Sequence, residues 1–271
     1  MVREYCDAIN VPDNARGVPT MSSAICAHYV LSSGVEPIMH MTTRDRNRIS
    51  IQSELYGAYA LGIRNILFIA GDHAKHGTHP GAKEVYDLDT IKAIELTSNL
   101  RQGVDFAGDE IEGAPEFYIG ATFNPNAQSL EEQVLLTEKK QAAGAQFFQT
   151  QAIFDPARLK DFMKLVTSLN PKVLAGIIPL RNIEMAEFMH NHVPEITIPK
   201  EIVSRMRDAG RGFDETERVE AQRNEGIQIA LELLGSIRKI KGVNGVHLMG
   251  VGWTESIIEL SKLGNLVPRP R

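Results

Sequence analysis

The 271-residue sequence has little cysteine, a single tryptophan and no long uninterrupted apolar run. Its two cysteines, Cys6 and Cys26, form neither a disulfide framework nor a CxxC pair, which is typical of a protein in a reducing compartment. No apolar run approaches the roughly 20 residues that cross a bilayer. The first residues also lack the apolar core of a signal peptide. We therefore expect a cytoplasmic protein without membrane insertion.

The sequence also lacks an excess of basic residues. The 29 Lys and Arg residues are interspersed with 34 Asp and Glu residues, for a net charge of −5 at pH 7. Nucleic-acid binding needs clustered basic residues, so we expect no nucleic-acid partner. The hydrophobic share of 43% is that of a globular protein with a core. No Gly/Ser-rich or Pro-rich linker interrupts the chain, and residues 1–271 are expected to form a single domain.

Short apolar runs alternate with helical stretches along the whole chain. Each run has the length and the Ile, Val, Leu or Phe content of a buried parallel strand. The runs are Tyr5–Val11, Pro37–Thr42, Asn65–Ala70, Phe117–Phe123, Phe147–Phe154, Val173–Pro179 and Val246–Val251. This alternation predicts an α/β fold with a parallel sheet covered by helices.

Helix signals lie in the intervals between these runs. Ser129 and Glu132 have the spacing of a capping box, and Asp155-Pro156 is typical of a helix start. Residues 196–206 and 211–223 are interpreted as an elaborated loop and the start of a long helix, because apolar residues then follow at helical spacing. Seven strands are recognisable where a closed (β/α)8 TIM-type barrel has eight. We therefore expect such a barrel with its first strand and helix absent from the written sequence.

Polar residues gather at the C-terminal ends of the expected strands, where barrels of this type carry their chemistry. Burying such groups costs about 1–3 kcal/mol unless they are paired, so several of them at one face predict a polar site. They are Asn10, Asp13, His40, Thr42, Asp72, Asn124 and Gln151. Each one alone is more often a structural hydrogen-bonding residue.

Other patterns point to no metal and no dinucleotide fingerprint. The histidines at 73, 76 and 79 lack HExxH spacing and favour a solvated loop. The glycine at 71 is not part of a GxGxxG sequence. The charged run Arg44–Arg48 either grips a phosphate or carboxylate, or starts a helix with internal Asp–Arg pairing, and the sequence does not choose between them.

Five ordered segments resemble the methylenetetrahydrofolate reductase family, and the resemblance as a whole runs over about residues 7–251. They are Pro37-Ile-Met-His-Met-Thr-Thr-Arg-Asp-Arg-Asn-Arg48, Leu61-Gly-Ile-Arg-Asn-Ile-Leu-Phe-Ile-Ala-Gly-Asp72, Ile119-Gly-Ala-Thr-Phe-Asn-Pro125, Glu138-Lys-Lys-Gln-Ala-Ala-Gly-Ala-Gln-Phe-Phe-Gln-Thr-Gln151 and Gly176-Ile-Ile-Pro179. The resemblance implies an eight-stranded barrel that holds FAD. It also implies a flavin-dependent oxidoreductase of one-carbon metabolism, which reduces 5,10-methylenetetrahydrofolate to 5-methyltetrahydrofolate.

The resemblance also implies roles for individual residues. Asp72 matches the catalytic aspartate, which lies beside the flavin and also binds the pterin, and Gln151 matches a glutamine that contacts the folate. The implied FAD-binding residues are Asn10, His40, Thr42, Gly71, Asp72, Asn124 and Lys140. The resemblance leaves open whether NADH, NADPH or a partner redox protein supplies the electrons, and whether the chain forms a homo-oligomer.

The sequence departs from the family pattern at three places. The family's glutamate on the first strand, its general acid, has no counterpart before Tyr5. Ala70 and Asn124 stand where some members have arginine and histidine, and Trp253 lies near a position where some use an arginine toward folate. One alternative is therefore a flavin-binding, partner-dependent or inactive homologue that does not itself reduce folate. A second is an unrelated barrel aldolase or methyltransferase, which would need a Schiff-base lysine at a strand end.

Overall fold

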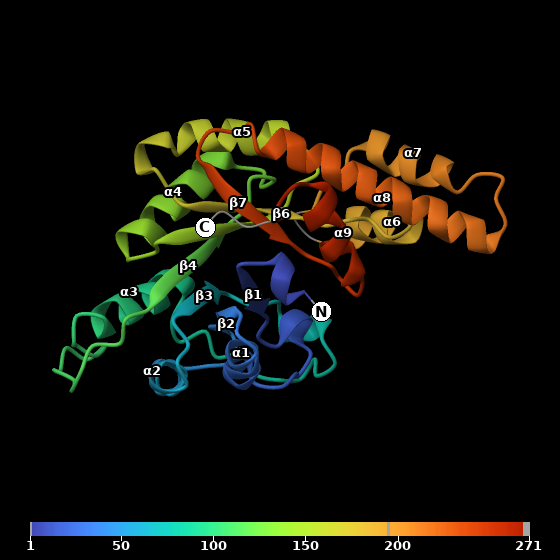
Figure 1. The fold of residues 1–271 in the computed structure, drawn as a ribbon. Helices are drawn as coiled ribbons and strands as arrows, with labels where there is room; N and C mark the ends of the chain where they lie inside the picture. Colours follow the sequence, from blue (N-terminus) through green and yellow to red (C-terminus); the bar gives the residue numbers. More distant parts are fainter. Residues whose placement is uncertain (1, 194–195, 268–271) are drawn as a thin grey trace. The chain divides into compact units, whose positions relative to one another are not determined.

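The fold is built on seven parallel strands whose order in the sheet follows their order in the chain. The computed structural model describes residues 2–193 and 196–267. The strands are β1 (Ala8–Val11), β2 (Glu36–Thr42), β3 (Asn65–Ile69), β4 (Tyr118–Phe123), β5 (Phe147–Ala152), β6 (Val173–Ile177) and β7 (Val243–Leu248). Helices separate successive strands (Figure 1). The predicted α/β fold of TIM type, with seven strands in this chain, is confirmed.

The helices are α1 (Ser23–Ser32), α2 (Arg48–Ala60), α3 (Thr90–Leu100), α4 (Leu130–Ala142), α5 (Pro156–Leu165), α6 (Ile183–His192), α7 (Lys200–Ala209), α8 (Glu215–Ile237) and α9 (Glu255–Leu263). Short 3-10 turns are η1 (Arg3–Tyr5), η2 (Ala15–Gly17), η3 (Ala74–His76) and η4 (Thr167–Leu169). The expected helix starts are present: the Asp155 side chain caps α5, and the Ser129 hydroxyl accepts from the Glu132 amide at 3.1 Å.

Three expected segments differ from the structure. The last strand, expected at Val246–Val251, is β7 at Val243–Leu248. The first strand begins at Ala8 rather than at Tyr5, because Tyr5 belongs to η1, where its carbonyl accepts from Ser261 on α9 at 3.2 Å. The expected loop over residues 196–206 contains the helix α7, whose Ile202 and Met206 are buried one turn apart. Pro199, which precedes its first residue, and that i, i+4 apolar pair are the sequence signals for this helix.

The chain divides into two compact units, and each is described by itself. The N-terminal unit comprises residues 7–122 and 136–148, and the C-terminal unit comprises residues 1–6, 123–135 and 149–271. The expectation of a single barrel domain stays a prediction.

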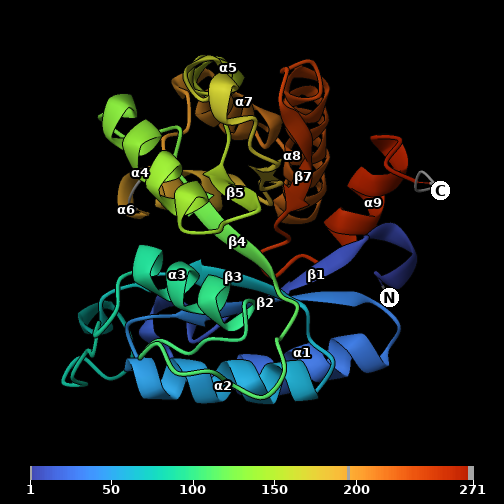
Figure 2. The ribbon, with the colours of Figure 1, turned by 90° about the vertical axis from the view of Figure 1, so that its left-hand side faces the viewer.

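In the N-terminal unit, α1 and α2 lie along one face of strands β1–β3 (Figure 2). The core there is formed by fully buried side chains of alternating strand positions, Met39 and Met41, and of one helix stripe, Ile51, Leu55 and Ala58. Strands β1 and β2 pair with Asn10 opposite Ile38, and β2 and β3 pair with His40 opposite Leu67. This register brings the C-terminal ends of β1, β2 and β3 to one edge.

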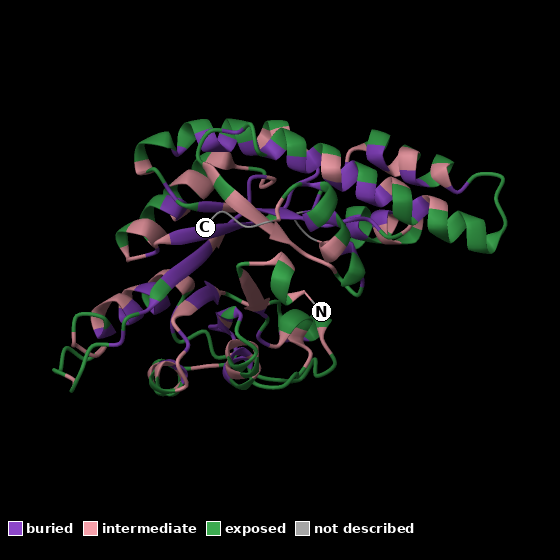
Figure 3. Ribbon diagram, viewed as in Figure 1, coloured by how far each residue is buried: buried purple, intermediate pink, exposed green. Residues whose placement is uncertain are grey.

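In the C-terminal unit, the helix α8 is buried along one side and exposed along the other (Figure 3). It packs against α7, and Arg205 of α7 pairs with Glu225 and Glu232 of α8 at 2.7 and 2.6 Å. Gly226 lets α8 approach the chain before α6, since a Cβ atom there would lie 1.7 Å from the Leu180 carbonyl oxygen.

Candidate functional site

The strand ends of the N-terminal unit carry the first pair of expected site residues. The His40 imidazole Nε2 lies 3.1 Å from the Asn10 side-chain oxygen, and both residues are half-buried. They come from the neighbouring strands β2 and β1. The structure therefore brings together two of the residues that the resemblance implies near FAD.

Asp13 and Thr42 form a buried contact. The Asp13 carboxylate accepts from the Thr42 amide at 2.8 Å and from its hydroxyl at 2.9 Å. It also pairs with Arg46, with the nearest atoms 2.6 Å apart. Thr42 is 1% exposed and Asp13 2%. Asp13 is thus committed to joining the loop after β1 to the end of β2, and a cofactor role for Thr42 stays a prediction.

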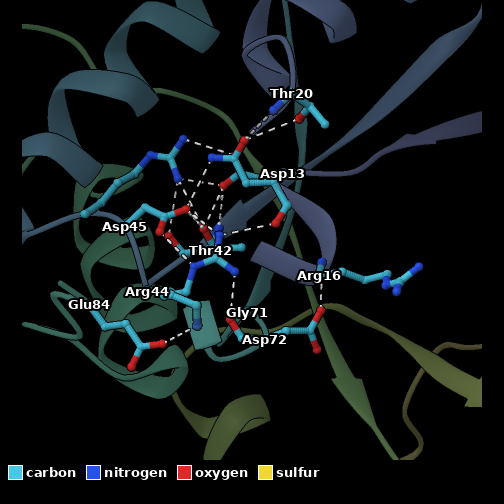
Figure 4. A network of polar contacts seen from close by, with 12 residues as sticks. Asp13, Arg16, Thr20, Thr42, Arg44, Asp45, Gly71, Asp72 and Glu84 are labelled. Atoms are coloured by element: carbon cyan, nitrogen blue, oxygen red, sulfur yellow. Dashed lines mark hydrogen bonds and ion pairs between the residues drawn. The ribbon is translucent and has the colours of Figure 1, made fainter. Parts of the chain in front are cut away.

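Within the charged run after β2, Arg44 pairs with Asp45, as the second of the two interpretations expected, whereas Arg46 and Arg48 pair with Asp13 and Asp87 outside the run. Nε of Arg44 donates to Asp45 at 2.7 Å and Nη2 donates at 2.6 Å (Figure 4). This pair raises the pKa of Arg44 and lowers the pKa of Asp45. Arg48 binds Asp87 in the same way and lowers the pKa of Asp87 to about 2.

Asp72 lies two residues beyond Ala70, in the loop after β3, and its side chain is exposed. One carboxylate oxygen accepts from the main-chain amide of Arg16 at 2.9 Å. Among the described residues, no cationic side chain forms an ion pair with this carboxylate. Gly71 precedes it with φ at 88°, in the left-handed region that favours glycine. Asp72 is therefore an accessible carboxylate with a fixed main chain.

Lys140 lies on α4, as the sequence interpretation expected. Its ammonium donates to the main-chain carbonyl of Thr122 at 2.7 Å. A Schiff-base enzyme of this class needs its lysine at a strand end, so this position gives no support to the aldolase alternative.

The C-terminal unit carries the two remaining expected site residues. Asn124 follows β4 and is 5% exposed; its oxygen accepts from the Asn126 amide at 2.9 Å. Its side-chain nitrogen Nδ2 is buried and has no hydrogen-bond partner among the described residues. Gln151 lies near the end of β5 with an exposed side chain, whereas its neighbours Gln149 and Thr150 are buried.

The histidine run after Asp72 forms no metal site in the described residues. His73 lies 3.1 Å from Glu84 and its ring also accepts from the Lys75 amide. Over residues 2–193 and 196–267, no group of three or more His, Cys, Asp or Glu side chains is arranged to hold a metal ion. In the same part of the chain, no helix has the length and apolar character to span a bilayer.

The structure also shows contacts that the sequence did not indicate. The amide of Arg16 and the hydroxyl of Tyr86 both bind the Gly71–Asp72 segment, and Tyr86 donates to the Gly71 carbonyl at 3.3 Å. No sequence pattern indicates that the main-chain amide of Arg16 binds the side chain of Asp72, which lies 56 residues further along the chain. In the C-terminal unit, an open pocket of about 430 Å³ lies beside Trp253, whose ring is 5.8 Å from the Arg223 guanidinium.

Seven parallel strands in chain order, separated by helices, define an α/β protein of the TIM type, and in its N-terminal unit a His–Asn pair and an exposed carboxylate lie at or just beyond the strand C-terminal ends. Comparison with known proteins then gives the family. A family model described as methylenetetrahydrofolate reductase matches residues 1–264. The chain belongs to this family.

Curated relatives are distant. The chain is 23% identical over 245 residues to a probable methylenetetrahydrofolate reductase (NADPH) of Caenorhabditis elegans, covering 90% of this chain and 34% of the relative. It is 25% identical over 217 residues to 5,10-methylenetetrahydrofolate reductase of Salmonella typhimurium, covering 79% of this chain and 65% of the relative. The chain thus spans about a third of the length of the Caenorhabditis elegans relative.

A solved structure has a similar fold. A protein from Clostridium thermocellum, described as binding two copies of 5-methyl-5,6,7,8-tetrahydrofolic acid, aligns with a TM-score of 0.62 at 14% identity. The alignment covers 96% of this chain and 84% of that protein. At this identity the likeness shows the fold.

Proposed function

We propose that this protein is a flavin-dependent oxidoreductase that reduces 5,10-methylenetetrahydrofolate to 5-methyltetrahydrofolate. The observation that carries the proposal is Asp72, an exposed carboxylate in the loop after β3 that accepts from the Arg16 amide. The sequence resemblance matches this residue to the family's catalytic aspartate. A carboxylate placed there can accept from pterin N–H groups and stabilise the positive charge that develops on the folate.

The residues present fit FAD as the cofactor. The orphaned Nδ2 of Asn124 is a buried donor that suits an acceptor such as a flavin carbonyl. The His40–Asn10 pair places polar ring and amide atoms at the strand ends, and the Lys140 ammonium, which donates to the Thr122 carbonyl, carries the positive charge that suits a phosphate. When bound and reduced by its electron donor, the flavin would supply the hydride. Gly71, Thr42 and Asp72 are assigned to the same cofactor site.

The folate would be held by Asp72 and Gln151. Gln151 presents an exposed amide with both donor and acceptor atoms, which suits the mixed donors and acceptors of a pterin. Folate binding is also the property named for the similar Clostridium thermocellum protein. The electron donor is NADH, NADPH or a partner redox protein, and the name of the Caenorhabditis elegans relative specifies NADPH.

The test uses the purified chain with added FAD. We expect a flavin absorbance band that stays with the protein, a higher melting temperature with FAD, and bleaching of the bound flavin by 5-methyltetrahydrofolate. At a hundredfold excess of FAD over its dissociation constant, the added stability should be about 2.7 kcal/mol. Absence of all three signals would contradict the proposal.

A second candidate is a flavin-binding homologue that does not itself reduce folate. It is favoured by the departures from the family pattern at Ala70, Asn124 and Trp253. The same experiment separates the two: retained flavin without any bleaching by 5-methyltetrahydrofolate supports this second candidate.

A further inference from the structure

Arg44 is buried, with 2% of its surface exposed, and its guanidinium contacts three loops of the N-terminal unit. Nη1 donates to the main-chain carbonyl of Asp72 at 2.8 Å, and Nη2 donates to the main-chain carbonyl of Asn14 at 3.2 Å. Its remaining contacts go to Asp45, in its own loop. The loops after β1, β2 and β3 therefore meet on one side chain (Figure 4).

The contact between Arg44 and the Asn14 carbonyl also affects Asp72, through the turn that contains Asn14 and Arg16. Asn14 and Arg16 have φ angles of 45° and 59°, in the left-handed region, which is unfavourable for a residue such as arginine. A turn in this conformation persists only when its surroundings hold it. It is this turn that presents the Arg16 amide to the Asp72 carboxylate at 2.9 Å.

One guanidinium thus fixes both parts of Asp72. It binds the main chain of Asp72 directly, and it holds the turn whose amide binds the Asp72 side chain. Only the planar fork of arginine, with five N–H donors, can reach Asp45, Asn14 and Asp72 at once. A lysine would keep the charge beside Asp45 but could not keep this geometry.

We propose that Arg44 is a positioning residue, which sets the orientation of the Asp72 carboxylate for catalysis. The inference rests on the proposed function for the role of Asp72, and on the structure alone for the contacts of Arg44. A purely structural arginine would only hold Asp45 and the fold. A positioning arginine also affects the catalytic rate, through the orientation of the Asp72 carboxylate.

The experiment compares Arg44→Lys with Arg48→Lys in the full chain. Arg48→Lys is the matched control. The Arg48 side chain forms an exposed ion pair with Asp87 and contacts neither Asp72 nor Asn14. The first measurement is hydrogen exchange at the Arg16 amide, which needs no flavin. We expect faster exchange in Arg44→Lys than in the wild type, and no change in Arg48→Lys.

The second measurement is turnover, with and without the Asp72→Asn replacement. Arg44→Lys should lower kcat/KM by about tenfold to a hundredfold, since misplacing a reacting group by about 1 Å has an effect of this size. In the Asp72→Asn background the same replacement should have almost no further effect. An equal loss in both backgrounds would show a structural role and overturn the proposal.

Each failure can be recognised separately. A wild-type chain without FAD-dependent turnover contradicts the proposed function, and the exchange measurement still tests Arg44. Unchanged exchange at Arg16 in Arg44→Lys overturns the positioning role. If Arg44→Lys does not fold, hydrogen exchange at the Arg16 amide of the wild type is the deciding measurement. Exchange at the unprotected rate overturns the proposal, and protection from exchange supports it.

Discussion

The ammonium of Lys140 on α4 and the main-chain carbonyl of Thr122 on β4 are 2.7 Å apart, so this helix is tied to the end of its own preceding strand. The contact fixes a cation beside a strand end, at a residue that the family resemblance assigns to the cofactor. The positive charge at this position favours an anionic ligand.

Lys140→Met should therefore weaken FAD binding by about tenfold or more. Charge-assisted hydrogen bonds contribute about 1.5–3 kcal/mol, and 1.4 kcal/mol is a tenfold change in affinity. The measurement is flavin titration by fluorescence quenching. The matched control is Lys139→Met, which removes the same charge from the exposed neighbouring position. Equal dissociation constants for the two variants would contradict the role of Lys140.

Asp72→Asn should slow folate reduction by about 10²–10³-fold while FAD still binds. The amide keeps the shape of the side chain but loses the charge that stabilises the transition state. Single-turnover bleaching of the flavin by 5-methyltetrahydrofolate measures the effect. Glu116→Gln, the same replacement at an exposed position, is the control. A variant as fast as this control would show that Asp72 has another role.

Gln151→Ala should raise the KM for the folate and leave kcat nearly unchanged. A neutral amide binds the substrate in the ground state and in the transition state alike, so its loss weakens both. Steady-state kinetics separate the two constants. The control is Gln128→Ala, at another exposed glutamine of the same unit. A fall in kcat at unchanged KM would place Gln151 in the chemical step instead.

The two glycines inside α8 should respond to alanine in opposite directions. Gly226→Ala is expected to destabilise the protein by about 1–3 kcal/mol, because the new Cβ atom would lie 1.7 Å from the Leu180 carbonyl oxygen. At Gly235 a new Cβ atom would have no neighbouring atom within 4 Å. Gly235→Ala should therefore stabilise the protein by about 0.5–1 kcal/mol, because alanine has a higher helix propensity than glycine. Urea unfolding measures both, and two changes of the same sign would contradict the packing at Gly226.

Stability should fall between pH 6.5 and 4 because of His247 on β7. Burial of its ring lowers the pKa of His247 from the ordinary 6.5 to about 4. In this window the unfolded chain binds a proton that the folded chain does not, so lowering the pH favours unfolding, by up to about 3 kcal/mol. His247→Gln should flatten this part of the pH profile in urea unfolding. The same replacement at exposed His192 should leave the slope as it is.

Much of the fold could be predicted because strands buried on both faces appear as continuous apolar runs. The run at Asn65–Ala70 became β3 (Asn65–Ile69), and Phe147–Phe154 became β5 (Phe147–Ala152). The helix α7 was missed because only Ile202 and Met206 face its core, too few to stand out from a polar loop. Tyr5 was assigned to a strand because its apolar ring gives no sign that its carbonyl binds Ser261.

The candidate site was predictable in its residue types and less so in its contacts. Strand-end positions identified Asn10 and His40, which do meet. The choice between an anion grip and internal pairing at Arg44 depended on partners as distant as Asn14 and Asp72, which no local pattern encodes. The donor to the Asp72 carboxylate is the main-chain amide of Arg16. Every residue except proline has such an amide, so the residue type at this position does not indicate the contact.

The strand order β1-β2-β3-β4-β5-β6-β7 has a consequence for synthesis on the ribosome. Every strand pairs with the one made just before it, so no strand must wait for a distant part of the chain to be translated. The connections are short compared with the whole chain, although the one between β6 and β7 covers residues 178–242, and short loops close faster than long ones. The sheet can therefore grow one strand at a time from its N-terminal edge, and at each stage only the newest strand lacks its next neighbour.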